Sequence, residues 1–126
     1  MNQYGGYTGM TAADFMAWLS HMAAEAGVQM DQLILGGDHL GPNAWKAEPL
    51  DVAMEKSREL VKSYVQAGFK KIHLDTNMAC GGETEEPDAL DVTSVDRFRD
   101  TIQSHRDAWS ARGLNAAWSR IVSVVT

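Results

Sequence analysis

Apolar residues recur at helical spacing early in the chain. Residues 11–26 carry an apolar stripe at intervals of three and four positions, which predicts an amphipathic helix. Thr11 is a suitable N-cap, Asp14 completes a capping-box pattern, and Gly27 is a suitable C-terminal stop. We expect Trp18, which falls on the stripe, to be buried in the core.

A second helical pattern lies between two runs that predict strands. Residues 33–35 are apolar at every position, as expected of a parallel strand that is buried on both faces. After a loop from residue 38 to residue 49, Asp51 is a suitable cap for a helix that ends at Gly68. The residues expected on its buried side are Met54, Ser57, Leu60, Val61, Tyr64 and Val65.

The second predicted strand, within residues 69–78, has two chemically different faces. Because side chains alternate along a strand, Ile72 and Leu74 share an apolar face. The opposite face carries the polar residues Lys71, His73 and Asp75.

The remaining sequence predicts a loop, a third helix and a final strand. Residues 80–92 have loop composition, and a capping pattern at Thr93 opens a helix that Gly113 ends. An apolar run over residues 120–125 predicts the last strand. Helices that alternate with buried strands indicate an α/β fold, built from right-handed βαβ units around a parallel sheet.

Composition narrows the class of protein. The length of 126 residues suits one domain. The net charge of −6, without a basic stripe, argues against nucleic acid as a partner. No apolar run approaches the ~20 residues of a membrane span. The single cysteine, Cys80, fits a reducing, cytoplasmic compartment.

Asp38 and His39 follow two glycines, close to the end of the first predicted strand. Glycine in such a place allows a ligand or another backbone to approach, so we interpret Gly36 and Gly37 as space for a ligand. An acid beside an imidazole suits binding or catalysis. The alternative is that Asp38 caps the loop and His39 makes a local hydrogen bond.

His73 and Asp75 form a second candidate pair. A buried charge needs a partner or a metal ion, so His73 is a candidate metal ligand and Asp75 a candidate orienting carboxylate or base. The alternative is an internal hydrogen-bond network that includes Lys71. The residues expected to be packed rather than functional are His21, His105 and Cys80.

Four stretches of the chain resemble one family. They are "NQYGGYTGMT", "LGGDHLGPNAW", "EPLDVAMEKSRELVKSYVQAGFKKIHLDTNMAC" and "DVTSVDRFRDTIQSHRDAWSARGLNAAWSRIVSVV". They are similar to the non-catalytic subunit of class II D-tagatose-1,6-bisphosphate aldolase. The resemblance implies a partial (β/α)8 TIM barrel with parallel strands and outer helices, as one domain over residues 1–126. The match resumes at Gly81 as if an αβ unit were absent between Cys80 and Gly81.

The resemblance also implies a function. It indicates a non-catalytic, stabilising subunit in the cytoplasmic catabolism of galactitol, N-acetylgalactosamine or tagatose 6-phosphate, paired with a separate catalytic aldolase subunit. A sugar phosphate is an expected ligand, and homo-oligomerisation stays open. Related sequences have been labelled tagatose-6-phosphate kinases, but this chain has no G-x-x-x-x-G-K-[ST] phosphate loop. The alternative is a metal-dependent epimerase of keto-sugars or keto-sugar acids on the same barrel.

Site residues follow from the same resemblance. In class II aldolases the residues that match Asp38 and His39 are a proton donor and a metal ligand. The catalytic candidates are therefore Asp38 and Asp75, and the metal candidates are His39 and His73, for zinc or another divalent metal. A catalytic zinc site usually needs three protein ligands, and the two histidines alone do not complete it.

Two loops are expected to contact sugar hydroxyls or phosphate. The candidate residues are Asn2, Gln3, Gly5, Gly6 and Asn43. The alternative for the first loop is a turn that only begins the first helix. Trp45, in the second loop, is expected to cover the mouth of a pocket.

Overall fold

The computed structural model describes residues 1–75, 79–82, 103 and 120–123. Three parallel strands form one sheet in the order β1-β2-β3. They are β1 (Gly36–Leu40), β2 (Lys71–Leu74) and β3 (Arg120–Ser123). The helices are α1 (Ala12–Glu25) and α2 (Leu50–Ala67), with short 3-10 helices η1 (Met30–Gln32) and η2 (Pro42–Trp45). The predicted α/β class with parallel strands is confirmed.

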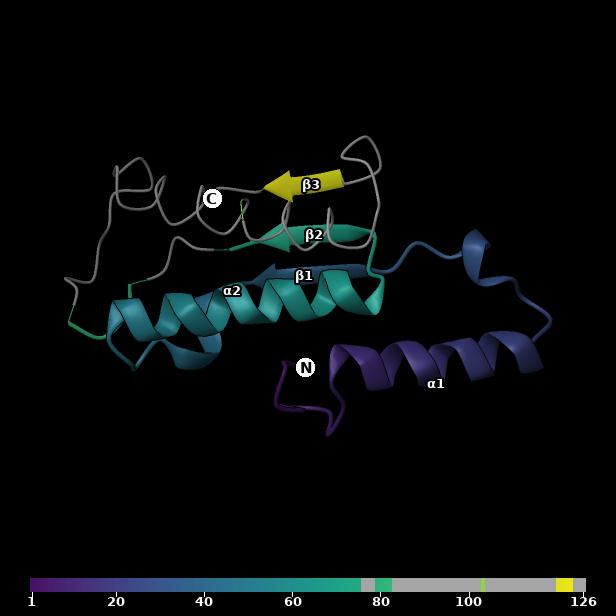
Figure 1. Ribbon diagram of the computed structural model, residues 1–126, viewed down its shortest axis with the longest axis horizontal. Helices are drawn as coiled ribbons and strands as arrows, with labels where there is room; N and C mark the ends of the chain where they lie inside the picture. The colour runs from purple at the N-terminus through teal and green to yellow at the C-terminus, as the bar shows by residue number, and fades with distance from the viewer. Residues whose placement is uncertain (76–78, 83–102, 104–119, 124–126) are drawn as a thin grey trace.

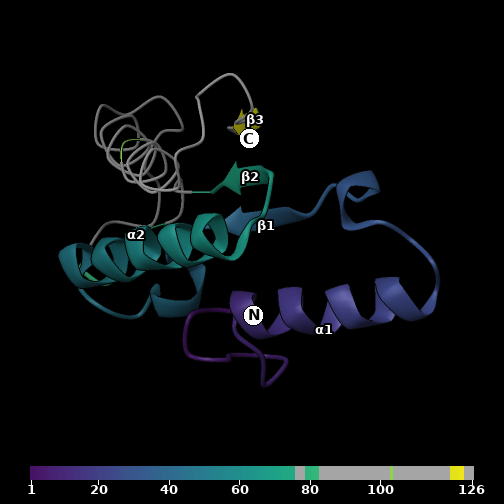
Figure 2. The same ribbon diagram turned by 45° about the vertical axis from the view of Figure 1, so that its right-hand side comes forward.

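Helix α2 runs antiparallel to the strands and covers one face of the sheet, and α1 lies beside α2 (Figures 1 and 2). A parallel pair of strands needs a crossover connection, and α2 supplies it between β1 and β2. Within the described residues, no helix is long and apolar enough to cross a membrane.

Helix α1 begins at the predicted cap. The Thr11 hydroxyl accepts a hydrogen bond from the Asp14 backbone N–H at 3.2 Å, and the Asp14 carboxylate accepts one from the Thr11 N–H at 2.9 Å. The hydrogen bonds from Thr11 hold the pKa of Asp14 below its usual value. Gly27 follows the helix with φ of 70°, so both predicted ends of α1 are confirmed.

The outward side of α1 differs from the prediction. Trp18 is 46% exposed, whereas the buried positions of α1 are the small residues Ala12 and Ala23. The expectation that Trp18 is core is therefore wrong. His21 is also exposed, and its Nε2 lies 3.4 Å from a Glu25 carboxylate oxygen, so it is not a packed residue.

Helix α2 confirms the predicted buried stripe at all its positions. Its N-cap is Pro49 rather than Asp51, because the extended backbone of Pro49 leads directly into the first turn. Asp51 lies within that turn, where a carboxylate is favoured by the helix dipole. Gly68 ends the helix in the left-handed conformation, with φ of 104°, as predicted.

The first strand lies later in the chain than predicted. Residues 33–35 are not part of the sheet, and Ile34 is 78% exposed. Pairing begins next to Leu35, whose carbonyl accepts hydrogen bonds from the backbone N–H groups of Lys70 and Lys71 at 2.9 and 3.0 Å. The position of β1 therefore depends on where β2 begins. The apolar run at residues 33–35 could not reveal this position by itself.

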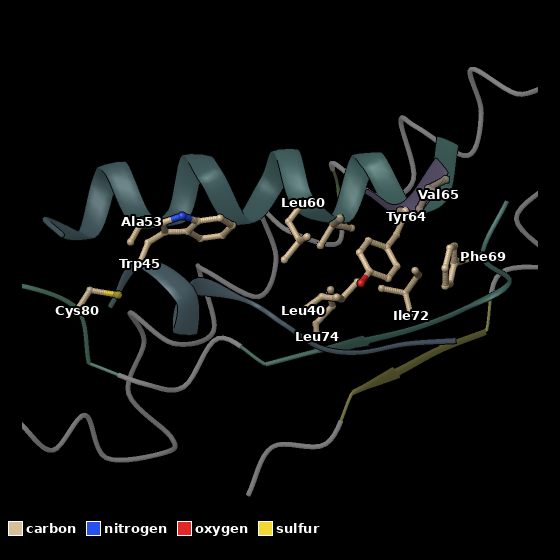
Figure 3. Packing of buried hydrophobic residues seen from close by; sticks show 12 residues of the cluster. Leu40, Trp45, Ala53, Leu60, Tyr64, Val65, Phe69, Ile72, Leu74 and Cys80 are labelled. Carbon is tan, nitrogen blue, oxygen red and sulfur yellow. The ribbon is translucent and has the colours of Figure 1, made fainter. Parts of the chain in front are cut away.

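The core lies between α2 and the sheet (Figure 3). Its residues include Leu40, Leu60, Val61, Tyr64, Val65, Phe69, Ile72 and Leu74. Trp45 is also buried in this cluster, with 8% exposure, so it does not cover a pocket mouth as expected. Cys80 is buried as predicted. The predicted third helix, the packing of His105 and most of the 80–92 loop lie outside the described residues.

Candidate functional site

A β-bulge in β1 places two consecutive polar side chains on one face of the sheet. The register with β2 shifts between Gly37 and Leu40, so β1 carries an extra residue there. Within the bulge His39 has φ of 53°, which is uncommon outside glycine. Asp38 and His39 are consequently both exposed, while Leu40 still turns into the core.

The bulge brings the two predicted acid–histidine pairs together. Asp38 Oδ1 lies 2.7 Å from Lys71 Nζ and 3.6 Å from His73 Nδ1. His39 Nδ1 lies 3.1 Å from Asp75 Oδ2. The rings of His39 and His73 are adjacent, with centroids 4.7 Å apart. We call Asp38, His39, Lys71, His73 and Asp75 the polar-face cluster.

The ion pair with Lys71 controls the state of Asp38. The hydrogen bond from Lys71 holds the pKa of the Asp38 carboxyl below its usual value, although partial desolvation opposes this effect. Asp38 is therefore an ionised acceptor near neutral pH. The burial pattern of β2 confirms the prediction that Lys71 shares a face with His73 and Asp75, whereas its pairing with Asp38 was not predicted.

The polar-face cluster gives no support to the metal centre that the resemblance implies. Within the described part of the chain, no group of three His, Cys, Asp or Glu side chains is arranged to hold a metal ion. The Nδ1 atom of His39 lies 3.1 Å from Asp75 Oδ2, and that of His73 lies 3.6 Å from Asp38 Oδ1. Because a catalytic zinc usually needs three protein ligands, metal binding by these histidines stays a prediction.

A pocket opens beside the cluster, with a cavity volume of about 160 Å3. Four predicted site residues contribute to it: Asn2, Asp38, His39 and Asn43. The other lining residues are Met1, Tyr7, Leu40, Gly41, Ala44, Leu60 and Tyr64. Binding sites for drug-sized ligands are usually larger, at roughly 300–1,000 Å3, so this pocket suits only part of a sugar phosphate.

The local structure of the first loop explains why Gly5 and Gly6 are glycines. Asn2 Oδ1 accepts hydrogen bonds from the backbone N–H groups of Tyr4 and Gly6, at 3.0 and 2.9 Å. A Cβ on Gly6 would lie 2.4 Å from Asn2 Nδ2, and Gly5 has φ of 77°. Neither glycine lines the pocket, so their contact with a ligand stays a prediction.

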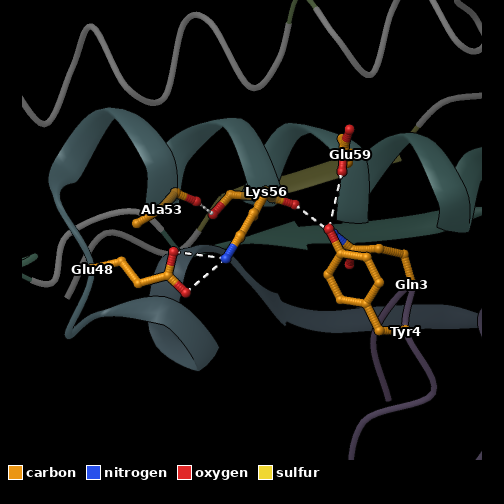
Figure 4. A network of polar contacts seen from close by, with 7 residues as sticks. Gln3, Tyr4, Glu48, Ala53, Lys56 and Glu59 are labelled. Carbon is orange, nitrogen blue, oxygen red and sulfur yellow. Dashed lines mark hydrogen bonds and ion pairs between the residues drawn. The ribbon is translucent and has the colours of Figure 1, made fainter.

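Gln3 and Tyr4 tie this loop to α2 rather than to the pocket (Figure 4). Gln3 Nε2 donates to the Lys56 carbonyl at 3.0 Å, and the Tyr4 hydroxyl donates to Glu59 at 3.4 Å. Lys56 Nζ in turn donates to both carboxylate oxygens of Glu48 at 2.7 Å. The predicted role of Gln3 in binding sugar therefore gains no support from its position.

The two glycines before Asp38 do not make room for a ligand. A Cβ on Gly37 would lie 2.7 Å from the Tyr64 ring, so its space is filled by α2. A Cβ on Gly36 would lie 3.0 Å from Lys71 Cδ. Our interpretation of Gly37 as ligand space is wrong, because α2 fills that space. At Gly36 the stem of Lys71 lies in the space, so the interpretation gains no support there.

Tyr64 is buried in the core and also contacts the first residue of the chain. Desolvation raises the pKa of its phenol, whose hydroxyl donates to the Met1 carbonyl at 3.1 Å. This contact holds the first loop over the end of β1. Tyr64 and Tyr7 are two aromatic pocket residues that the sequence did not indicate as binding groups.

Comparisons with a family model and with curated proteins identify the same kind of protein. The model of the D-tagatose-1,6-bisphosphate aldolase subunit GatZ/KbaZ-like family matches residues 1–88 and 80–126, which together cover the chain. The D-tagatose-1,6-bisphosphate aldolase subunits GatZ of Escherichia coli O157:H7 and Shigella flexneri are each 37% identical over 171 residues. These matches cover 99% of this chain and 41% of each relative.

The chain thus spans less than half the length of these curated relatives. The alignment of 171 residues is longer than the chain, and the two family matches overlap over residues 80–88. The relatives therefore have residues within the aligned region that this chain lacks. That these residues form one αβ unit between Cys80 and Gly81 stays a prediction.

A solved structure is also similar. It is the crystal structure of a probable tagatose 6 phosphate kinase from Sinorhizobium meliloti 1021, with 38% identity and a TM-score of 0.68. The match covers 97% of this chain and 39% of that protein. The fold and sequence comparisons therefore agree.

Proposed function

The chain belongs to the GatZ/KbaZ-like family of D-tagatose-1,6-bisphosphate aldolase subunits, and we propose that it acts as a non-catalytic, stabilising subunit of such an aldolase. Its partner would be a separate catalytic subunit that cleaves D-tagatose 1,6-bisphosphate into glycerone phosphate and glyceraldehyde 3-phosphate. The setting would be cytoplasmic carbohydrate catabolism. The observation that carries the proposal is the family match along the whole chain.

We also propose that the chain forms part of a (β/α)8 barrel. Its three strands are parallel, and α2 covers one face of the sheet as an outer helix would. The polar-face cluster lies on the opposite face, which would line the barrel interior. In such barrels, functional groups gather at the carboxyl ends of the strands, where Asp38, His39 and Asp75 lie.

The state of Asp38 argues against a role as proton donor. A proton donor must carry its proton at the working pH, whereas the Lys71 ammonium at 2.7 Å favours the ionised form of Asp38. An ionised carboxylate can still accept hydrogen bonds from sugar hydroxyls. Asp38 would therefore bind a ligand rather than protonate it.

The other activities receive less support. An epimerase that depends on metal needs a complete ligand set, and the described residues offer no suitable group of three. The label of kinase belongs to the Sinorhizobium meliloti protein, and this chain has no phosphate loop of the P-loop type.

The test is the lifetime of a catalytic tagatose-bisphosphate aldolase subunit at a temperature where it slowly inactivates. We expect equimolar addition of this chain to lengthen the half-life of aldolase activity by about threefold or more, as a bound partner stabilises a native state. An unrelated protein at the same concentration is the control. Cleavage of D-tagatose 1,6-bisphosphate by the chain alone, or an unchanged half-life, would reject the proposal.

A further inference from the structure

Tyr7 is held in an unusual conformation at the edge of the pocket. Its φ is 70°, in the left-handed region that bulky residues rarely adopt. The Thr8 N–H donates to the Gly6 carbonyl at 3.0 Å, which closes a tight γ-turn around Tyr7. Glycine would adopt this turn without strain, yet the chain has tyrosine here.

Packing does not explain the choice of tyrosine. Tyr7 is 94% exposed, so its ring gains little from burial against the described residues. Strained backbone of this kind tends to persist at binding sites, where the position of a side chain matters more than stability. The ring of Tyr7 therefore points to an interaction with something other than the described core.

The pocket beside Tyr7 is polar but carries no strong cation. Asp38, His39 and Asn43 contribute hydrogen-bonding groups, and no Lys or Arg is among the described lining residues. Phosphate is usually bound by Arg or Lys side chains, and Lys71, the lysine beside this pocket, is already paired with Asp38 at 2.7 Å. The pocket chemistry therefore suits hydroxyl groups rather than phosphate.

We propose that this pocket binds the uncharged, hydroxyl-bearing part of a ketose, with the Tyr7 ring stacked over it. The C–H bonds on one side of a sugar are weakly positive, and they would lie against the negative face of the aromatic ring. Asp38 and Asn43 would accept and donate hydrogen bonds to the hydroxyls. Only the choice of a ketose rests on the proposed function; the turn at Tyr7 and the pocket chemistry do not.

The test measures binding of free D-tagatose to the whole chain by isothermal titration calorimetry, with inorganic phosphate in a parallel titration. We expect saturable binding of D-tagatose and none of phosphate. Tyr7→Gly and Tyr7→Asn both tolerate the turn and remove the ring, so each should weaken binding by about tenfold or more, a loss of about 1.4 kcal/mol. Relief of strain should raise the melting temperature of Tyr7→Gly by about 4 °C.

Two further variants separate the ring from the hydroxyl and from the loop. Tyr7→Phe keeps the ring and should bind D-tagatose within about threefold of wild type. Tyr4→Phe, a change in the same loop outside the pocket, is the matched control and should bind equally. The inference would be overturned if the chain did not bind D-tagatose, or if phosphate displaced it. It would also be overturned if both variants that lack the Tyr7 ring bound D-tagatose as tightly as wild type.

This experiment uses no partner subunit, so it fails separately from the proposed function. Binding of D-tagatose without any effect on aldolase lifetime would reject the accessory role and leave the pocket assignment standing. A longer aldolase lifetime without binding of D-tagatose would do the reverse.

Discussion

The two faces of the β1–β2 pair have opposite chemistry, although both belong to the same two neighbouring strands. One face turns Leu40, Ile72 and Leu74 toward α2, and all three are at most 3% exposed. The other face carries the polar-face cluster, in which Asp38 and His39 are mostly exposed. The residues that stabilise the fold and the residues of the candidate site therefore lie on opposite faces of one sheet.

The bulge in β1 makes this separation possible. Under strict alternation, a residue two positions after Gly37 would again face the helix, so His39 would enter the core and Leu40 would leave it. The extra residue, with φ of 53° at His39, keeps Leu40 inside. A local backbone irregularity therefore supports both the core and the cluster.

The largest loss of stability is expected for a substitution just after the end of β1. A Cβ on Gly41 would lie 1.5 Å from the Asp75 carbonyl oxygen, a distance that only movement of the backbone can relieve. Gly41→Ala should lower the free energy of unfolding by about 4 kcal/mol or more, measured by urea denaturation. Unchanged stability would show that β1 and the end of β2 do not approach as closely as described.

The next largest effect separates the faces along β2. Ile72 is fully buried, so Ile72→Ala should lower the free energy of unfolding by about 3 kcal/mol through lost burial and a cavity. His73→Ala, at the next position but on the other face, should change it by about 1 kcal/mol or less. Equal losses in the two variants would contradict the division.

The adjacent glycines sharpen the comparison within β1. Gly37→Ala would force a methyl group against the Tyr64 ring and Leu40, and should lower the free energy of unfolding by about 2 kcal/mol. Gly36→Ala meets only the flexible stem of Lys71, which can move, so we expect less than about 1 kcal/mol. Thermal denaturation of both variants, followed by circular dichroism, measures the difference.

The smallest of these effects depends on pH. Lys71 lowers the pKa of Asp38 in the folded state, so the stabilisation is present above the unfolded pKa and is lost as pH falls through the folded value. Lys71→Met should therefore reduce the acid-induced loss of stability between pH 7 and about pH 3, by less than about 1 kcal/mol because the pair is exposed. Asp14 titrates in both proteins and cancels in the difference. Identical pH profiles would show that the ion pair contributes nothing.

The sequence predicted those features that depend on neighbouring residues. The capping box of α1, the buried stripe of α2 and the two faces of β2 were all visible as short-range patterns. The location of β1 was not, because pairing with β2 begins at Gly36 and leaves the apolar run 33–35 outside the sheet. The burial of Trp45 and the exposure of Trp18 likewise depend on which element packs against each.

The candidate site was predicted in part. Asp38, His39, His73 and Asp75 were chosen from strand position and family resemblance, and the structure brings them together. Their pairing across the strands depends on the bulge, which has no clear local signal in the sequence. The contribution of Tyr7 was missed for a related reason, since it depends on how the first loop lies over β1.

The most direct test of the divided sheet is the free energy of unfolding of a variant without the titratable groups of the polar-face cluster except Lys71. The substitutions are Asp38→Asn, His39→Asn, His73→Gln and Asp75→Asn. Asparagine is chosen at position 39 because it tolerates the positive φ of the backbone there. We predict a cooperative urea transition, with stability within about 1 kcal/mol of wild type. A loss as large as that of Ile72→Ala, or the absence of a cooperative transition, would contradict the division.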